Sequence, residues 1–164
     1  ILGHSERREM GESDELINRK VVQAIKHGLT VILAIGETNQ TDDAHTIIQQ
    51  ELQADLRGVS SGNIKKIFIA YEPRWAISRG KDDITGTPDT PENAIEKSIV
   101  IRRVISKLYT AKIATGMKVL YGGSVRSKNI ASFVFKDSGF NGALVGGASL
   151  DAKEFLELLH RIRR

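Results

Sequence analysis

The chain has 164 residues, of which 40% are hydrophobic, and this is enough for one domain with a substantial core, which we place over residues 1–164. It contains no cysteine, which excludes a disulfide framework and thiol chemistry. No apolar run approaches the roughly 20 residues of a membrane span and no signal peptide is apparent, so we expect a cytoplasmic protein without a membrane partner. The net charge is +4, and its basic residues are not clustered with aromatic ones, so we expect no nucleic-acid partner.

Strands and helices are predicted to alternate along the chain. Residues 1–2 look like the end of a strand, and further strands are predicted at 29–35, 67–71, 118–121 and 142–145. Helices are predicted at 14–27, 43–57, 126–135 and 151–163, and another begins at Thr90-Pro91 and carries apolar residues as far as Leu108. The segment 29–35 is apolar nearly throughout, as is typical of a strand that is covered on both faces.

This alternation predicts a parallel sheet with right-handed crossovers. A doubly wound sheet and a barrel both satisfy the pattern. The strand ends favour the barrel, because every predicted strand is followed by a polar or glycine-rich turn, whereas a doubly wound sheet gathers its glycines at one switch point. We therefore expect an α/β fold of the (β/α)8 barrel type, present here as an incomplete barrel.

A glutamate at a strand end is the first candidate for chemistry. Glu72 directly follows the strand at 67–71, and Pro73 prevents a helix from starting there. Trp75, Ala76 and Ile77 then form an apolar stretch in an expected loop. The pattern fits a general base beneath a mobile lid, and the alternative is an ordinary glutamate on a surface turn.

Two glycine pairs follow the last two predicted strands. They are Gly122-Gly123-Ser124 and Gly146-Gly147-Ala148-Ser149. Glycine permits close approach of a ligand to the backbone, and loops after the last two strands of a barrel commonly bind phosphate. One such pair usually marks only a turn, but two in these positions predict a phosphate site.

Four segments of the chain resemble the triosephosphate isomerase family, in the family's order and at similar spacing, from Ile1 to the C-terminus. They are Gly3-His4-Ser5-Glu6-Arg7-Arg8, Ala70-Tyr71-Glu72-Pro73 with Trp75-Ala76-Ile77, Tyr121-Gly122-Gly123-Ser124-Val125, and residues 142–150. The resemblance implies interconversion of dihydroxyacetone phosphate and glyceraldehyde 3-phosphate, a reaction of glycolysis and gluconeogenesis, without a metal or organic cofactor.

The resemblance also implies the site residues. Glu72 would be the general base and His4 the donor to the enediolate oxygen, roles that general enzymology describes for this family. Glu6 would be a polar partner near the substrate, or else an ion-pair partner of Arg7 or Arg8. The alternative for His4 is a histidine that only caps a helix or lies in the core. Phosphate would be held by Ser78, Ser124, Gly146 and Gly147, and the lid would comprise Pro73, Trp75, Ala76 and Ile77.

Departures from the family pattern modify these expectations. The match begins at the end of the family's fourth strand, so strands one to three, and with them a lysine near the substrate, have no counterpart here. We therefore expect at most trace activity from the isolated chain, and either a homo-oligomer or a complex with a complementing N-terminal segment. The alternative is a non-catalytic family member that binds phosphate or serves as a structural remnant. Arg74 replaces a small apolar lid residue, and Ser78-Arg79 replaces the usual Gly-Thr.

Overall fold

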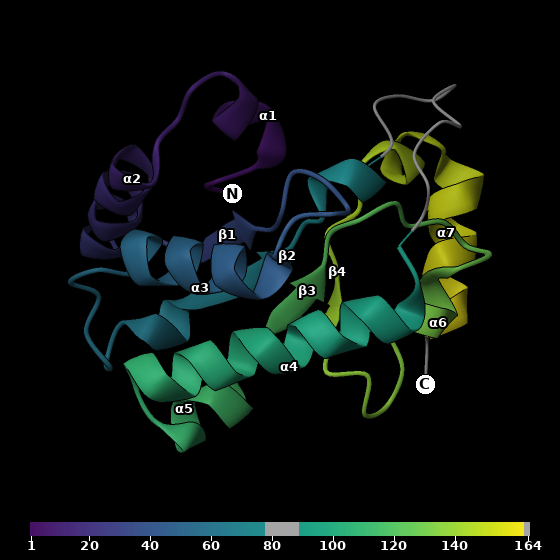
Figure 1. Ribbon diagram of the computed structural model, residues 1–164. Helices are drawn as coiled ribbons and strands as arrows, with labels where there is room; N and C mark the ends of the chain where they lie inside the picture. Colours follow the sequence, from purple (N-terminus) through teal and green to yellow (C-terminus); the bar gives the residue numbers. More distant parts are fainter. Residues whose placement is uncertain (78–88, 163–164) are drawn as a thin grey trace.

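A computed structural model describes residues 1–77 and 89–162, and its centre is a parallel sheet. Its strands are β1 (Val31–Ile35), β2 (Ile67–Tyr71), β3 (Val119–Tyr121) and β4 (Gly142–Ala143), in the order β1-β2-β3-β4. Leu2 extends the β1 edge through an isolated parallel bridge to Leu33. The order in space follows the order in the chain without reversal, which confirms part of an α/β barrel rather than a doubly wound sheet. The sheet does not close on itself within the described residues (Figure 1).

The long helices α2, α3 and α4 follow one another along one side of the sheet (Figure 1). The helices are α1 (Ser5–Glu9), α2 (Asp14–Lys26), α3 (Ala44–Asp55), α4 (Pro91–Leu108), α5 (Ala111–Gly116), α6 (Ile130–Phe133) and α7 (Ala152–Ile162). Short 3-10 turns are η1 (Ile64–Lys66), η2 (Arg74–Ala76) and η3 (Gly147–Leu150). Side-chain caps start several helices, as when Thr90 Oγ1 accepts from Asn93 N at 3.2 Å with Pro91 in the first turn of α4.

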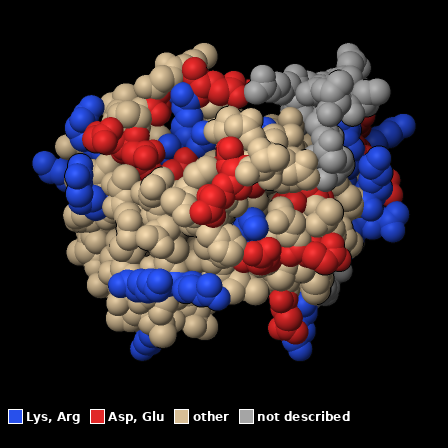
Figure 2. Space-filling model, viewed as in Figure 1, with Lys and Arg blue, Asp and Glu red and all other residues tan. Residues whose placement is uncertain are grey.

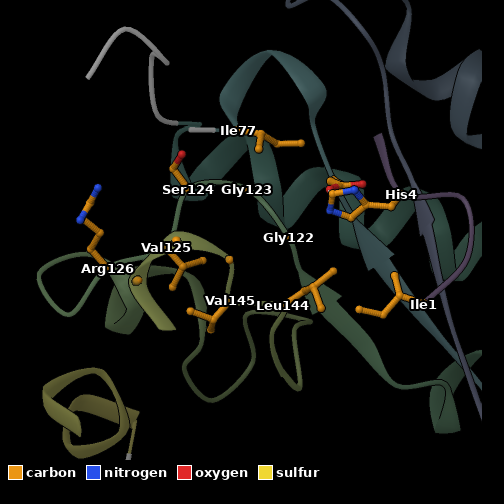
Figure 3. A pocket seen from close by; sticks show the side chains of 14 residues that line it. Ile1, His4, Ile77, Gly122, Gly123, Ser124, Val125, Arg126, Leu144 and Val145 are labelled. Carbon is orange, nitrogen blue, oxygen red and sulfur yellow. The ribbon is translucent and has the colours of Figure 1, made fainter. Parts of the chain in front are cut away.

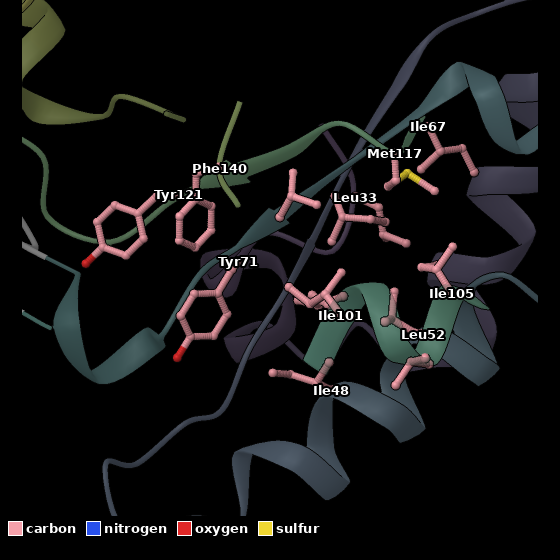
Figure 4. Packing of buried hydrophobic residues seen from close by; sticks show 14 of the residues in the cluster. Leu33, Ile48, Leu52, Ile67, Tyr71, Ile101, Ile105, Met117, Tyr121 and Phe140 are labelled. Carbon is pink, nitrogen blue, oxygen red and sulfur yellow. The ribbon is translucent and has the colours of Figure 1, made fainter. Parts of the chain in front are cut away.

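The core lies between the sheet and these helices (Figure 4). Leu33 and Ile69 of the sheet and Leu52 and Ile101 of the helices are fully buried. Toward β4 the core becomes aromatic, because the rings of Tyr121 and Phe133 stack with their centroids 4.1 Å apart. Burial of these side chains supplies the main driving force for folding of the described part.

The helix predicted over residues 126–135 is wrong in its first half, since only Ile130–Phe133 is helical. Asn129 explains the difference. Its Oδ1 accepts from Arg126 N at 2.8 Å, and its Nδ2 donates to Ser124 O at 3.0 Å. The side chain thus holds the preceding residues in a turn, as asparagine often does.

Smaller predictions also need correction. The strand predicted over 142–145 spans only Gly142–Ala143, and α1 and α5 were not predicted. In the last helix, predicted to end at Arg163, the described part ends at Ile162. On this helix Leu158 is buried, while the neighbouring Leu159 is 41% exposed.

The face of the molecule in Figure 2 shows no concentrated field of one sign among its described residues. Lys and Arg lie among Asp and Glu over the face in Figure 2. Among the residues that the structure describes, no helix is long and apolar enough to cross a bilayer.

Candidate active site

Glycines on the two neighbouring strand ends set the position of Glu72. Glu72 N donates to Ile35 O at 2.7 Å, which continues the sheet past β2. A Cβ added to Gly36 would lie 2.3 Å from Glu72 O, and one added to Gly122 would lie 3.1 Å from Tyr71 O. Larger residues at these positions would push the strand ends apart, so the glycines allow the glutamate to sit close between its neighbours.

The Glu72 side chain is almost fully enclosed, with only 3% of the residue exposed. Its Oε2 accepts from Ser5 N at 3.0 Å and its Oε1 accepts from Ser5 Oγ at 3.3 Å. His4 Nε2 lies 3.0 Å from the same Oε1. Burial raises the pKa of Glu72, and the contacts with His4 and Ser5 oppose that rise. A carboxyl with a raised pKa, already beside a histidine, is suited to proton transfer.

The helix that follows His4 orients its ring. His4 is the N-cap of α1, and its Nδ1 accepts from Glu6 N at 3.4 Å. A nitrogen that accepts a hydrogen bond carries no proton, so the neutral ring has its proton on Nε2, which points toward Glu72. His4 therefore caps α1 and also lies in the candidate site, so the two interpretations of this residue are compatible.

Glu6 is exposed and does not line the cavity described below. The alternative pairing of Glu6 with a neighbouring arginine is wrong. Arg7 pairs instead with Glu12 at 2.6 Å, and Arg8 pairs with Asp55 at 2.8 Å. Glu6 thus contributes its backbone to the site through its amide, while a role for its carboxylate stays a prediction.

The predicted lid residues lie in and around the turn η2. Pro73 precedes this turn, and Ala76 within it is buried. Trp75 does not line the cavity described below, and its Nε1 donates to Glu37 Oε1 at 2.8 Å. Tyr71 Oη donates to the same oxygen at 2.9 Å, so a buried carboxylate holds the indole. Ile77 lines the cavity, and Ser78 lies outside the described residues.

The two predicted phosphate loops face the same space. Ser124 is tied to the lid segment, since its amide and its hydroxyl donate to Ala76 O at 3.0 and 2.8 Å. Gly146 and Gly147 are different, because a Cβ built on either would meet no atom within 4 Å. Neither glycine is required by packing against the protein, which fits a requirement for close approach by a ligand.

A cavity of about 250 Å³ joins these elements (Figure 3). It contains six of the residues predicted from the sequence, namely His4, Glu72, Ile77, Ser124, Gly146 and Gly147. Ile1 and Leu144 form part of its apolar wall, and Arg126 adds a cation that the sequence analysis did not predict. The sequence did contain a signal for Arg126, because this residue lies two positions after the predicted phosphate-binding segment Gly122–Ser124. No group of three or more His, Asp or Glu side chains in the described ranges is placed to hold a metal ion.

A buried ionic network lies behind the strand ends, and the sequence analysis did not predict it. Arg8 Nη1 lies 2.5 Å from Asp14 Oδ1 and 3.4 Å from Glu51 Oε1, and its Nη2 lies 2.8 Å from Asp55 Oδ2. Arg74 pairs with Glu51 from the other side. Burial raises the pKa of Glu51 and raises the pKa of Asp55 to about 7.

Sequential parallel strands, crossover helices and a cavity at the carboxyl ends of the strands define part of an α/β barrel with a ligand site. A family model described as triosephosphate isomerase matches residues 1–162. The chain belongs to the triosephosphate isomerase family, which confirms the resemblance of its four motifs.

Individual relatives agree with the family match. A triosephosphate isomerase from Geobacter metallireducens is 43% identical over 159 residues, which cover 94% of this chain and 61% of the relative. One from a Roseiflexus species is 43% identical over 164 residues, covering 98% and 62%. One from Mycoplasmoides gallisepticum is 42% identical over 163 residues, covering 97% and 62%. The chain thus spans less than two thirds of the length of these curated relatives.

Proposed function

We propose that this chain carries the proton-transfer part and the phosphate loops of a triosephosphate isomerase site. The observation that supports this most is the pair His4 and Glu72, with 3.0 Å between Nε2 and Oε1, in a cavity that also contains Gly146 and Gly147. The substrate carbonyl oxygen would replace Glu72 as the acceptor from His4 Nε2–H. The freed carboxylate would then take the proton from the carbon next to that carbonyl, leaving an enediolate.

The expected contributions follow from the chemistry of the two groups. A positioned general base contributes roughly 10²–10⁴-fold to the rate. The hydrogen bond from His4 would strengthen as negative charge develops on the oxygen, which is stabilisation of the oxyanion-hole kind. The enediolate reacts onward when its hydroxyl proton moves to the other enediolate oxygen and the Glu72 carboxyl returns its proton to the neighbouring carbon. The base and the acid at carbon are therefore the same side chain, and no redox partner is needed.

Binding of phosphoglycolate tests this assignment without requiring turnover. Its planar carboxylate resembles the enediolate and its phosphate would occupy the glycine loops. We expect phosphoglycolate to move the NMR signals of the His4 ring and of the Gly146 and Gly147 amides, whereas inorganic phosphate moves only the glycines. An unmoved His4 signal with saturated phosphate loops would show that the proton-transfer assignment is wrong.

Turnover distinguishes a catalytic chain from a non-catalytic, phosphate-binding one. We expect at most trace conversion of glyceraldehyde 3-phosphate by the isolated chain, because the family's lysine near the substrate has no counterpart among these residues. Glu72→Asp is the control. A rate typical of whole family members, abolished by this substitution, would contradict the expected inactivity while supporting the assignment of Glu72.

We also propose that the chain associates through apolar surface, either with a second copy or with a complementing N-terminal segment. Leu150 is 85% exposed, Ile1 67% and Leu156 56%. Exposed apolar surface of this kind favours an interface when its members are contiguous. The short strand β4 also has an unpaired edge among the described residues, which offers backbone groups to a partner strand.

A further inference from the structure

Arg126 is the only lysine or arginine among the described residues that line the cavity. Its side chain lies at the opposite end of the cavity from His4 and near Ser124 (Figure 3). The two ends of the cavity therefore differ in chemistry. One end has the buried carboxylate of Glu72, and the other has a guanidinium beside the glycine loops.

The backbone of Arg126 is held in place. Its amide donates to Asn129 Oδ1 at 2.8 Å, and its carbonyl accepts from Ile130 N at 2.9 Å. These bonds place the start of the side chain at the cavity wall without using the guanidinium. Because the guanidinium fork is planar and pre-organised, arginine loses less freedom than lysine for each hydrogen bond that it makes to an anion.

No carboxylate of the described residues forms an ion pair with Arg126. Glu154 is the acidic residue that contacts this loop, and its two oxygens accept from Ser127 N at 2.7 Å and from Ser127 Oγ at 3.0 Å. Arg126 as a residue is half-buried. A cation in this position keeps its hydrogen-bonding capacity for a ligand in the cavity.

The other donors at this end are neutral. Ser124 already donates its amide and hydroxyl to Ala76 O, so a ligand must compete for them. Gly146 and Gly147 supply backbone amides, which carry no formal charge. A phosphate dianion that leaves water needs a compensating charge, and an arginine fork matches its geometry through two charge-assisted hydrogen bonds.

We propose that Arg126 binds the phosphate group of the ligand directly and supplies the positive charge of the phosphate end of this cavity. This rests on the proposed function, in which the glycine loops bind the phosphate. It adds a side chain that the four family motifs do not include. The ligand class is a phosphate monoester with its dianion toward Arg126 and its reacting carbons toward Glu72.

Titration with inorganic phosphate, followed through the Gly146 and Gly147 amide signals, tests the proposal. We expect Arg126→Gln to weaken binding about three- to tenfold, as loss of a charge-assisted contact implies. Lys128→Gln is the matched control, since Lys128 is exposed, lies two residues away and does not line the cavity. It should change the dissociation constant less than twofold.

Two further measurements separate a direct contact from a structural effect. Arg126→Lys, which keeps the charge, should retain part of the affinity. Arg126→Gln should also reduce the dependence of affinity on ionic strength, because one attractive charge is gone. Unchanged amide positions elsewhere in the spectrum would show that each variant is folded.

The outcomes distinguish this inference from the function on which it rests. Equal phosphate affinity in the parent chain and Arg126→Gln, or equal weakening by Lys128→Gln, would overturn the role of Arg126 and leave the phosphate loops intact. Absence of any shift at Gly146 and Gly147 in the parent chain at tens of millimolar phosphate would overturn both.

Discussion

Arg74 forms an ion pair with the buried carboxylate of Glu51, and this contact fastens the start of the predicted lid segment, residues 73–77, to helix α3. Arg74 Nη1 also donates to Thr38 Oγ1 at 3.0 Å. The other oxygen of Glu51 accepts from Gly36 N at 2.8 Å, so one carboxylate holds both the lid segment and the glycine beside Glu72.

The same carboxylate reaches the segment of His4 through a second arginine. Arg8 Nη1 lies 3.4 Å from Glu51 Oε1, and Arg8 Nε donates to Gly3 O at 2.9 Å. The segments that carry His4 and Glu72 are therefore connected through one buried acid. A substitution of either Arg8 or Arg74 should therefore perturb both of these segments.

Arg74→Met should lower the free energy of unfolding by roughly 1–3 kcal/mol, because it leaves a buried carboxylate with one of its two cations. Urea denaturation at neutral pH measures the change. Arg161→Met is the control, since Arg161 pairs with Glu157 on the exposed face of α7. That variant should remain within about 0.5 kcal/mol of the parent chain. Equal effects of the two substitutions would contradict the role given to the buried pair.

Stability should fall as pH rises toward neutrality, because Asp55 has a pKa of about 7 in the folded state against an ordinary value of 3.8. Burial is the main cause, and the nearby Asp14 and Glu51 carboxylates share the guanidinium of Arg8 with Asp55. One buried oxygen of Asp55 also has no hydrogen-bond partner. The folded protein holds a proton that the unfolded chain has released, so the stabilisation is complete below about pH 4 and is lost by about pH 7.

Urea denaturation at several pH values between 5 and 8 measures this dependence. We expect a loss of about 1 kcal/mol per pH unit between pH 5 and 7 from this group, levelling off above it. The raised pKa values of Glu51 and Glu72 act in the same direction. Asp55→Asn should remove the contribution of this residue, and an unchanged slope in that variant would refute the assignment.

Gly36→Ala should destabilise the protein and displace Glu72. The added methyl would lie 2.3 Å from Glu72 O, and Gly36 has a φ of 154°, so the backbone must shift to admit it. We expect a loss of about 1–3 kcal/mol, as for other overpacked sites, together with a change at the His4 ring signal. Gly116→Ala is the matched control, because its Cβ would meet nothing within 4 Å. An unchanged His4 signal in Gly36→Ala would contradict the close-approach explanation.

The isolated chain should associate in solution with itself, or with a complementing N-terminal segment when one is supplied. Sedimentation equilibrium across a wide concentration range measures this. Leu156→Glu should weaken association, because it places a charge on exposed apolar surface of α7. Ile99→Glu, on exposed surface of α4, tests whether the effect is local. A compact monomer at micromolar concentration that unfolds cooperatively without a second chain would overturn the proposed association.

Local signals allowed much of the fold to be predicted. The Pro91 start of α4 and the strand Ile67–Tyr71 were predicted as the structure shows them, because a cap and an apolar run are each contained in a few residues. The helix at 126–135 was predicted wrongly, since its apolar residues fit a helical spacing while Asn129 holds the preceding backbone in a turn. Periodicity reports burial and carries no information on such side-chain competition.

The residues of the candidate site could be predicted from sequence motifs, whereas the contacts that support them could not. His4 and Glu72 could be paired because both lie at strand ends of one barrel edge. The Arg8–Asp55 pair joins residues 47 positions apart, and no spacing rule connects them. Arg74 was noticed only as a departure at a lid position, because its partner on α3 is visible only in three dimensions.

Trp75 is the single tryptophan of the chain, and its indole is bonded to the buried Glu37 carboxylate. Intrinsic tryptophan fluorescence is therefore a single-site optical probe of the segment directly after Glu72, free of background from other indoles. Release of the indole from Glu37 would change the polarity around it and shift its emission. The predicted lid segment can thus be followed in real time during rapid mixing with a ligand, with no label attached and no residue replaced.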